Sequence, residues 1–230
     1  MTALEECLQS MNAIYRADPE NAVRSQKFIM ELHKYIQADL QSRLTKKAKR
    51  RGIEVLLEKT VLGSHKSKDV DVGIYDPVNG PLMMIGVRSQ MSSVGKNVLT
   101  YYQDIVGECI SLQDRYPMAT YGYCYLMPLN PINGAKKKET ITHGRFARMY
   151  DAISGRSGKA YRDITGVYDE FAYLVVDFDQ APPALRDDIV LASVPGVDLS
   201  VTTFVDRLVA RHVSRNLFWE IFESDEYVGV

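Results

Sequence analysis

Two aspartates, Asp69 and Asp71, stand in an alternating apolar segment, KDVDVGIY at residues 68–75. The alternation predicts a β-strand with Asp71 inside it and Asp69 at its start. A carboxylate fixed on a strand is a ligand that Mg²⁺ prefers, and a bound divalent cation can acidify a water molecule. The alternative is a strand-end aspartate that solvent or a turn satisfies. We expect Asp71 to be functional and Asp69 to be its solvated neighbour.

A second segment, MIGVRSQMSSVGKN at residues 84–97, begins with another predicted strand. Side chains repeat every two residues along a strand, so Gly86, Arg88 and Gln90 should share one surface. An arginine that points into a sheet is costly unless it meets an anion. That anion is either a bound phosphate or Asp71 in an internal salt bridge, and the sequence leaves both open.

Three more carboxylates lie on predicted helices. Asp104 and Glu108 are four residues apart, which places them on one helix face, and Glu31 lies on the first long helix. Each is a further candidate metal ligand, because one aspartate alone makes a weak Mg²⁺ site. The alternatives are a solvated helix face or, for Asp104 and Glu108, partners for Arg88.

Polar and basic residues stand beside both strands. The candidates for contacts to a nucleic-acid backbone are Lys66, Lys68, Ser92, Ser93, Lys96 and Asn97. The last four precede a predicted helix, where one such residue suffices as a cap and free N–H groups can hold a phosphate. A dense basic run at residues 46–51 adds positive charge, although a solvated helix end is the more common explanation for such a run.

The hydrophobic spacing predicts the elements that must position these residues. Helical periodicity covers residues 20–49, 98–112, 141–153 and 202–222. Strand character covers residues 53–62, 70–75, 82–90, 120–127 and 171–178. The sequence DPVNGP at residues 76–81 predicts a turn, so the second and third strands should form an antiparallel hairpin. The order favours an α/β fold with a central mixed sheet flanked by helices on both faces.

The composition fits a single domain. With 230 residues and 46% hydrophobic residues, the chain can bury one sizeable core, and we expect residues 180–230 to form a C-terminal helical extension of it. The net charge of −1 excludes a globally basic nucleic-acid binder but not a segregated basic surface. Apolar runs are too short for a membrane span and the N-terminus lacks a signal pattern, which predicts a cytoplasmic location.

Cysteine and histidine patterns point to no familiar metal motif. The cysteines, Cys7, Cys109 and Cys124, form no CxxC pair, and the four histidines form no HExxH or HxH pattern. These spacings argue against a disulfide framework, a zinc site of known pattern and an HNH-type nuclease.

The order α, β, β, β, α, β and the two segments resemble the PD-(D/E)XK, or restriction-endonuclease-like, nuclease superfamily. The specific part of the resemblance is residues 69–97, and the rest of the chain matches in element order. In that superfamily an aspartate on the second core strand and an acid-x-Lys on the third hold Mg²⁺ beside the scissile phosphate. This chain resembles that pattern at Asp71, but Gly86-Val87-Arg88 replaces the acid-x-Lys.

The resemblance implies a Mg²⁺-dependent DNA endonuclease of the restriction or anti-phage defence kind. It assigns catalysis to Asp71, Arg88, Gln90, Asp104 and Glu108, and the metal to Asp71, Asp104, Glu108 and Glu31. In these roles Asp71 and a helix carboxylate hold the cation, Arg88 stabilises phosphoryl charge and Gln90 orients the water. Some superfamily members carry the second acid on the following helix, which is why Asp104 and Glu108 enter the set.

Two further expectations follow from the resemblance. Cutting both strands of a duplex usually requires two active sites, which implies a homodimer to which residues 202–222 and Trp219 contribute. The rival is a nuclease-fold protein that has lost catalysis and binds DNA or a partner protein, and Gly86 favours it. If the enzyme interpretation holds, Gly86→Glu should restore the missing acid and raise Mg²⁺ affinity.

Overall fold

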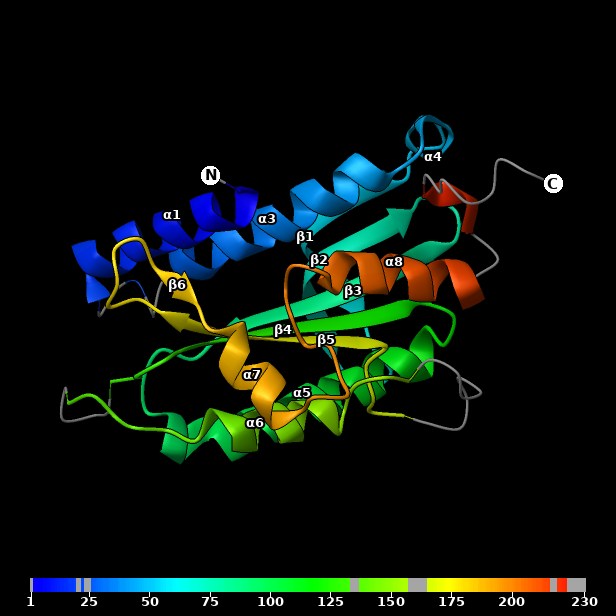
Figure 1. The fold of residues 1–230 in the computed structure, drawn as a ribbon. Helices are drawn as coiled ribbons and strands as arrows, with labels where there is room; N and C mark the ends of the chain where they lie inside the picture. The colour runs from blue at the N-terminus through cyan, green and yellow to red at the C-terminus, as the bar shows by residue number, and fades with distance from the viewer. Residues whose placement is uncertain are drawn as a thin grey trace.

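The computed structural model describes residues 2–19, 22, 26–132, 137–156, 165–215 and 219–222. A six-stranded sheet runs through it, with the strands side by side in chain order (Figure 1). The strands are β1 (Glu54–Leu62), β2 (Ser67–Asp76), β3 (Gly80–Ser89), β4 (Thr120–Pro128), β5 (Glu170–Asp177) and β6 (Ala184–Leu185). Strands β1 to β3 pair antiparallel, β3 to β5 pair parallel, and β6 is antiparallel to β5. The predicted mixed sheet is confirmed.

The turn between β2 and β3 is organised by Asp76. Its carboxylate accepts hydrogen bonds from the backbone N–H groups of Val78 (2.8 Å) and Asn79 (3.3 Å). Gly80 follows with φ of 81°, a conformation that glycine adopts without steric cost. The expected hairpin is therefore present, and it sets the two strands that carry Asp71 and Arg88 beside each other.

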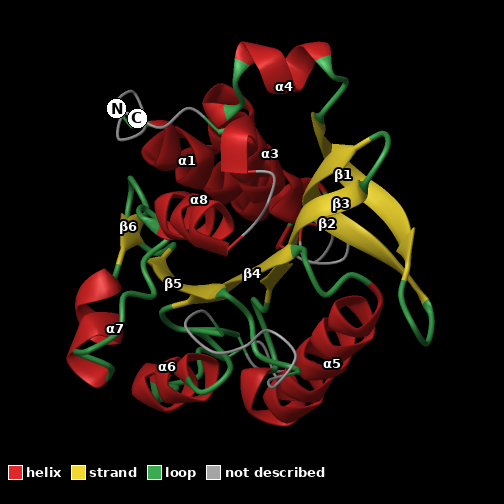
Figure 2. Ribbon diagram, turned by 90° about the vertical axis from the view of Figure 1, so that its right-hand side faces the viewer, coloured by secondary structure: helices red, strands yellow, loops and turns green. Residues whose placement is uncertain are grey.

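Helices cover both faces of the sheet (Figure 2). One face packs against α1 (Ala3–Ala17), α3 (Lys27–Arg43) and α8 (Phe204–Arg215). The other packs against α5 (Val94–Arg115), α6 (His143–Asp151) and α7 (Asp187–Ser193). This three-layer arrangement explains why β4 and β5 are buried along their whole length.

The alternating tyrosines of β4 belong to the core. Tyr123 and Tyr125 point to the α5 and α6 side, where Tyr150 stacks on Tyr125 with ring centroids 5.0 Å apart and on Phe171 with centroids 4.8 Å apart. The intervening Cys124 packs on the opposite face. Stacked aromatic pairs add packing energy beyond buried area, so these rings hold the sheet together and do not offer a base-stacking surface.

The long helix expected at residues 20–49 is divided. Leu44 forms a β-bridge with Phe222, and the Thr45 side chain accepts from the Ala48 N–H (3.1 Å), which starts a separate short helix, α4 (Lys46–Arg50). Helix α1 lies outside the predicted elements. Thr2 and Glu5 form a capping box at its start, and the Thr-x-x-Glu pattern that produces it is present at residues 2–5 of the sequence.

The described part of residues 180–230 is joined closely to the core. It contains β6, α7, α8 and a 3₁₀ turn, η1 (Trp219–Ile221), and α8 packs on β4 and β5. The expected helix at 202–222 is thus shorter than the periodicity indicated, and the Trp219 side chain, expected in a dimer contact, lies outside the described residues. No helix of the described part is both long and apolar enough to cross a membrane.

Candidate metal centre

Asp71 lies where two strand ladders are interrupted. Between β1 and β2 the register pairs Leu57 with Val72 and Lys59 with Val70, and the position between them is unpaired. Between β2 and β3 the pairing stops at Val72. In its place the Val87 N–H donates a hydrogen bond of 2.6 Å to Asp71 Oδ2. The Asp71 side chain therefore replaces a backbone carbonyl and is fixed between the strands.

Two residues from other elements converge on Asp71. Glu58 lies opposite it on β1 and has a φ of 50°, which is uncommon for a residue with a side chain. His33 comes from α3, and its Nδ1 is 2.9 Å from Glu58 Oε1. One ligand atom from each of His33, Glu58 and Asp71 lies within 4.8 Å of the other two. Within the described ranges this is the one group of three metal-ligating side chains at such spacing.

The polar atoms of this cluster are unusually short of hydrogen bonds. The side chain of His33 is 2% exposed, yet neither ring nitrogen makes a hydrogen bond, and Glu58 Oε1 is buried without one. The 2.9 Å approach of His33 Nδ1 to Glu58 Oε1 is within ion-pair distance although its angle departs from hydrogen-bond geometry, so Nε2 is the ring nitrogen with no partner at all among the described residues. A buried polar atom left unpaired costs about 1–3 kcal/mol, which calls for an explanation.

Burial also sets the protonation of the three side chains. It raises the pKa of Asp71 from 3.8 to about 6, against the opposing effects of the Val87 N–H and Lys68. Burial, together with the charge of Asp71, raises the pKa of Glu58. Burial lowers the pKa of His33, and Glu58 opposes this. His33 is therefore neutral at physiological pH and keeps one nitrogen lone pair free to bind a cation.

The predicted partners of Asp71 on the α5 side are brought near it. Glu108 raises the Asp71 pKa, and Lys68 and Arg88 lower it. Lys68 Nζ lies 2.9 Å from Glu108 Oε1. The Arg88 guanidinium stacks on Tyr101 at 4.6 Å from the ring centroid, and its buried Nη1 has no hydrogen-bond partner. Arg88 thus makes no salt bridge with Asp71 and keeps a donor for an anion.

The absence of a side chain at Gly86 makes room for the ring of Tyr123 on the neighbouring strand. A Cβ at this position would lie 2.5 Å from the ring of Tyr123, its buried neighbour on β4. A cavity of about 20 Å³, the room of about one water, adjoins it and is lined also by Lys68 and Glu108. The proposal that Gly86→Glu restores an acid therefore meets a steric obstacle, because the buried ring occupies the space that a larger side chain needs.

Several predicted site residues are occupied by structural contacts. Gln90 is buried, accepts from the Tyr125 hydroxyl (2.7 Å) and donates to the Ser93 carbonyl (3.4 Å). Ser92 bridges to Ile132, and Ser93 precedes α5 without a side-chain cap bond. The sequence assigned Gln90 to catalysis, but its amide is bonded inside the protein.

The other candidates lie outside the Asp71 cluster. Asp104 is exposed on α5, and Lys66 and Lys96 are exposed, with Asn97 half-buried, around the approach to β2 and α5. Glu31 faces the groove between α1 and α3 and pairs with Lys34 (2.9 Å). Glu31 and Asp104 therefore do not join the metal-ligating group.

The basic run of α4 lies apart from the other lysines. Helix α4 precedes the start of β1, whereas Lys66 and Lys68 lie near the other end of this nine-residue strand, where Lys68 pairs with Val61, roughly 23 Å from Glu54. Lys47 and Arg51 also pair with Glu220 (3.2 and 3.0 Å). The basic run at residues 46–51 and the lysines beside β2 therefore form separate patches.

His33 and Glu58 are the functional candidates that the sequence did not reveal. His33 stands among apolar residues on the buried side of α3, which was a signal for a buried histidine but not for its partner. Glu58 gave no signal, because its positive φ depends on the β1–β2 register.

No family model, curated protein or solved structure matches the chain. The functional interpretation consequently depends on the chemistry of the residues themselves.

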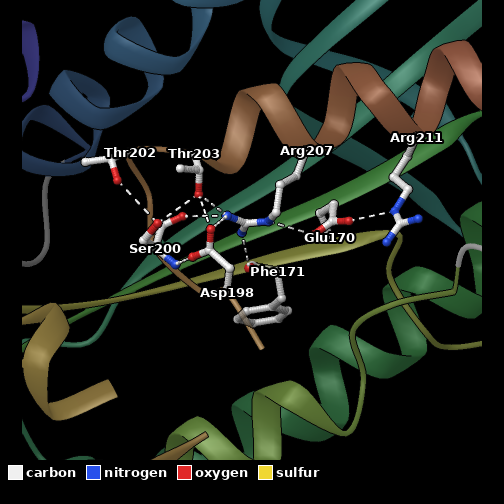
Figure 3. Close-up of polar contacts among 8 residues, drawn as sticks. All are labelled: Glu170, Phe171, Asp198, Ser200, Thr202, Thr203, Arg207 and Arg211. Carbon is white, nitrogen blue, oxygen red and sulfur yellow. Dashed lines mark hydrogen bonds and ion pairs between the residues drawn. The ribbon is translucent and has the colours of Figure 1, made fainter. Parts of the chain in front are cut away.

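A second polar cluster connects α8 to the start of β5 (Figure 3). Arg207 Nε donates to Glu170 Oε2 (2.8 Å), Nη1 to the Ser200 carbonyl (3.2 Å) and Nη2 to the Phe171 carbonyl (3.1 Å). Asp198 Oδ2 lies 3.1 Å from Nη1. All three guanidinium nitrogens thus have partners within the protein.

The acids of this cluster are equally well satisfied. The second oxygen of Glu170 accepts from Arg211 Nε (2.8 Å), and Asp198 accepts from the Ser200 N–H (2.8 Å) and the Thr203 hydroxyl. Burial raises the pKa of Asp198, but these hydrogen bonds and Arg207 outweigh it, so the pKa is lowered overall. The geometry assigns this cluster to holding α8 on the sheet.

Proposed function

We propose that this protein is a divalent-metal-dependent DNA endonuclease of the restriction or anti-phage defence kind, acting at Asp71. One observation carries the proposal: Asp71 lies at a break in the sheet beside unpaired polar atoms of His33, Glu58 and Arg88. His33 lies on the α3 side of the sheet and Arg88, stacked on Tyr101 of α5, lies on the other side, so the proposal places a cation at Asp71 and a phosphate at Arg88. The α-β-β-β-α-β order around this position supports the same assignment by analogy of fold.

The side chains around Asp71 have separable roles in this proposal. Asp71 and Glu58 hold the cation, whether Mg²⁺ or Mn²⁺, because hard divalent cations select carboxylate oxygens. When bound, that cation acidifies a water and neutralises charge on the phosphoryl group. The unpaired Nη1 of Arg88 donates to a phosphate oxygen, and stacking on Tyr101 fixes the guanidinium plane. Glu108 holds Lys68 beside this centre.

The proposed partner is duplex DNA, bound by a homodimer. Lys66 and Lys96 are exposed, as contacts to a phosphate backbone require. Two copies of the chain supply the two sites that a double-strand break needs. The chain's net charge of −1 means that this attraction is local, so affinity should fall steeply as salt rises.

A second candidate function has its own supporting observation. Gly86 stands where the resemblance calls for an acid, and Tyr123 fills the space beside it. A nuclease fold that has exchanged an acid for core packing would bind DNA or a partner protein without cutting. In this alternative Arg88 still binds a phosphate, whereas Asp71 has only a structural role.

Cleavage of supercoiled plasmid in Mg²⁺ and in Mn²⁺, with EDTA as the blank, tests the proposal. The matched variants are Asp71→Asn, which keeps the hydrogen bond from Val87, and Asp104→Asn, which removes an exposed acid from the same side of the sheet. We expect Asp71→Asn to reduce the rate about 100-fold or more, as for loss of several kcal/mol of transition-state stabilisation. Asp104→Asn should leave the rate unchanged.

The outcome separates the two candidates. Metal-dependent cleavage that Asp71→Asn abolishes supports the enzyme. Salt-sensitive DNA binding that Arg88→Met weakens, with no cleavage by the wild type in either metal, supports the inactive binder. Absence of both binding and cleavage on any duplex would reject the DNA assignment.

A further inference from the structure

We infer that the cation at Asp71 is a first-row transition metal such as Mn²⁺, bound through the imidazole of His33 as well as through Glu58 and Asp71. The inference deepens the proposed function, on which it rests for the role of the metal, because it names the ligand set and so the class of cation. The metal site itself can be tested without DNA.

The burial and bonding of His33 carry the inference. Its ring is 2% exposed on the sheet side of α3, Nε2 has no partner in the described part of the chain, and Nδ1 meets only Glu58 Oε1, at 2.9 Å and without good hydrogen-bond geometry. A structural histidine in this protein is different: His143 contacts the Tyr173 hydroxyl at 2.7 Å and the Leu129 carbonyl at 2.9 Å through its two nitrogens. His33 lies among carboxylates with Nδ1 only in an angularly poor contact with Glu58 and with Nε2 unpartnered within the described ranges, an arrangement that suits a metal ligand.

The spacing of the three ligand atoms fits one ion. Ligands about 2.1 Å from a single metal lie roughly 3–4 Å from one another in tetrahedral or octahedral arrangements. The three atoms here all lie within 4.8 Å of one another, and His33 Nδ1 and Glu58 Oε1 are 2.9 Å apart. Small side-chain adjustments therefore suffice to bring all three to one cation.

The backbone supports the same conclusion. Glu58 has a positive φ in the interior of a strand, and such local strain persists where the surroundings require it, often at ligand sites. The unpaired position in the β1–β2 ladder coincides with this residue. A regular strand would turn Glu58 differently, so the irregularity serves to direct its carboxylate toward His33.

The mixed donor set decides the class of metal. Mg²⁺ is bound by oxygen ligands, whereas an imidazole nitrogen suits Fe²⁺ or Zn²⁺ better, and Mn²⁺ is the first-row metal that otherwise shares the preference of Mg²⁺ for carboxylate and water. Three protein ligands leave open positions for water and for a substrate oxygen, as in catalytic sites. Glu58, at 29% exposure, is the ligand from which solvent and substrate can approach.

The experiment is spectroscopy of Mn²⁺ bound to the metal-free full chain. Electron spin echo measurements report nitrogen modulation when an imidazole coordinates Mn²⁺, and Mg²⁺ competition gives the relative affinities. The test variant is His33→Gln, and the matched control is His65→Gln, which removes an exposed histidine. Circular dichroism confirms that each variant is folded.

We expect nitrogen modulation in the wild type and in His65→Gln and its loss in His33→Gln. Mn²⁺ affinity should fall at least about tenfold in His33→Gln, the lower end of what loss of even a supporting contact costs. Mg²⁺ affinity should change by less than about threefold, because Mg²⁺ gains little from the imidazole. If His33→Gln does not fold, wild-type protein with isotopically labelled histidine must show the modulation change instead.

Two results would overturn the inference: Mn²⁺ bound without nitrogen modulation in the wild type, or modulation that survives in His33→Gln. The outcomes also distinguish it from the proposed function. Nitrogen-bound Mn²⁺ in a protein that cleaves no DNA would refute the nuclease and leave the metal site standing. Cleavage of DNA in Mg²⁺ by a protein that shows no nitrogen-bound Mn²⁺ would support the nuclease and refute the histidine-containing metal site.

Discussion

Two polar clusters on the same sheet differ in how completely their hydrogen bonds are made. Around Arg207 every guanidinium nitrogen and both oxygens of Glu170 have partners within the protein (Figure 3). Around Asp71, buried atoms of His33, Glu58 and Arg88 have none. Both clusters hold charged residues in largely buried positions, so burial alone does not distinguish them.

This difference indicates that the Arg207 cluster has a structural role and supports the proposal that the Asp71 cluster binds a ligand. A polar network in which every donor and acceptor has a partner within the protein stabilises the fold. It has no free donor or acceptor for a ligand. Buried polar atoms without a partner reduce the stability of the fold. They are retained in a protein where a ligand or ion supplies the missing partner. The comparison therefore predicts that substitutions in the two clusters will change the free energy of unfolding in opposite directions.

The largest effect should follow from breaking the Arg207 cluster. Arg207→Met leaves Glu170, which is 6% exposed, with one partner fewer, and loss of one member of a buried ion pair costs about 3–5 kcal/mol. Urea unfolding measures it. The control is Arg186→Met, which breaks the exposed pair with Asp188 and should have a far smaller effect, because solvent screens an exposed ion pair. Equal losses in both variants would mean that the cluster has no special structural role.

The pH dependence of stability should differ between the clusters. The folded-state pKa of Asp71, about 6, lies above its ordinary value of 3.8, so the folded protein binds this proton more tightly. Its contribution is fully present below pH 3.8 and is lost as pH rises through about 6, by on the order of 3 kcal/mol. Unfolding of Asp71→Asn in EDTA should lack this decline.

Asp198 should show the opposite sign. Its pKa is lowered in the folded state, so its contribution is present at neutral pH and is lost as pH falls through the folded-state pKa. In Asp198→Asn the free energy of unfolding should fall less steeply as the pH is lowered at the acid end. The change between pH 4 and pH 6, which we assign to Asp71, should remain. If Asp71→Asn and Asp198→Asn both show the same dependence of unfolding free energy on pH as the wild type, these two residues are not the source of that dependence.

A smaller effect is expected beside the metal cluster, at Gly86. The Cβ of Gly86→Ala would lie 2.5 Å from the Tyr123 ring, and overpacking of this kind costs about 2 kcal/mol. Thermal and urea unfolding check it, with Gly107→Ala on α5, where a Cβ meets nothing within 4 Å, as the control. A neutral Gly86→Ala would reopen the possibility of an acid there.

The smallest and most distinctive effect is a gain in stability. His33→Leu removes the unpartnered Nε2 together with the poorly aligned contact of Nδ1 with Glu58 and nearly keeps the side-chain volume, which should raise the free energy of unfolding in EDTA by about 1 kcal/mol. Added Mn²⁺ should stabilise the wild type but not the variant. A destabilised His33→Leu would show that the histidine contributes to the fold and would weaken the comparison.

The sequence predicted the frame of the molecule well. Periodicity placed the strands, and the turn at Asp76 fixed the hairpin that sets Asp71 beside Val87. It missed the division of the first long helix, because the bridge between Leu44 and Phe222 joins residues that are distant in sequence. Local patterns define elements, whereas such pairings depend on the tertiary structure.

The candidate site was predicted in part, for the same reason. Asp71, Arg88 and Glu108 were predicted from strand and helix spacing together with the family resemblance, and the charges of Arg88 and Glu108 act on the pKa of Asp71 in the structure. His33 and Glu58 were not, since their convergence depends on helix packing and on a strand irregularity. Gln90 was assigned to the site because strand alternation gives the face but not the partner.

The metal site around Asp71 can be located in a crystal of the wild type that is soaked in Mn²⁺ and measured at the manganese absorption edge. We expect one anomalous peak bounded by His33, Glu58 and Asp71, with no peak at the Arg207 cluster. A peak elsewhere only, or a direct hydrogen bond between His33 and Glu58 with no peak beside them, would contradict it.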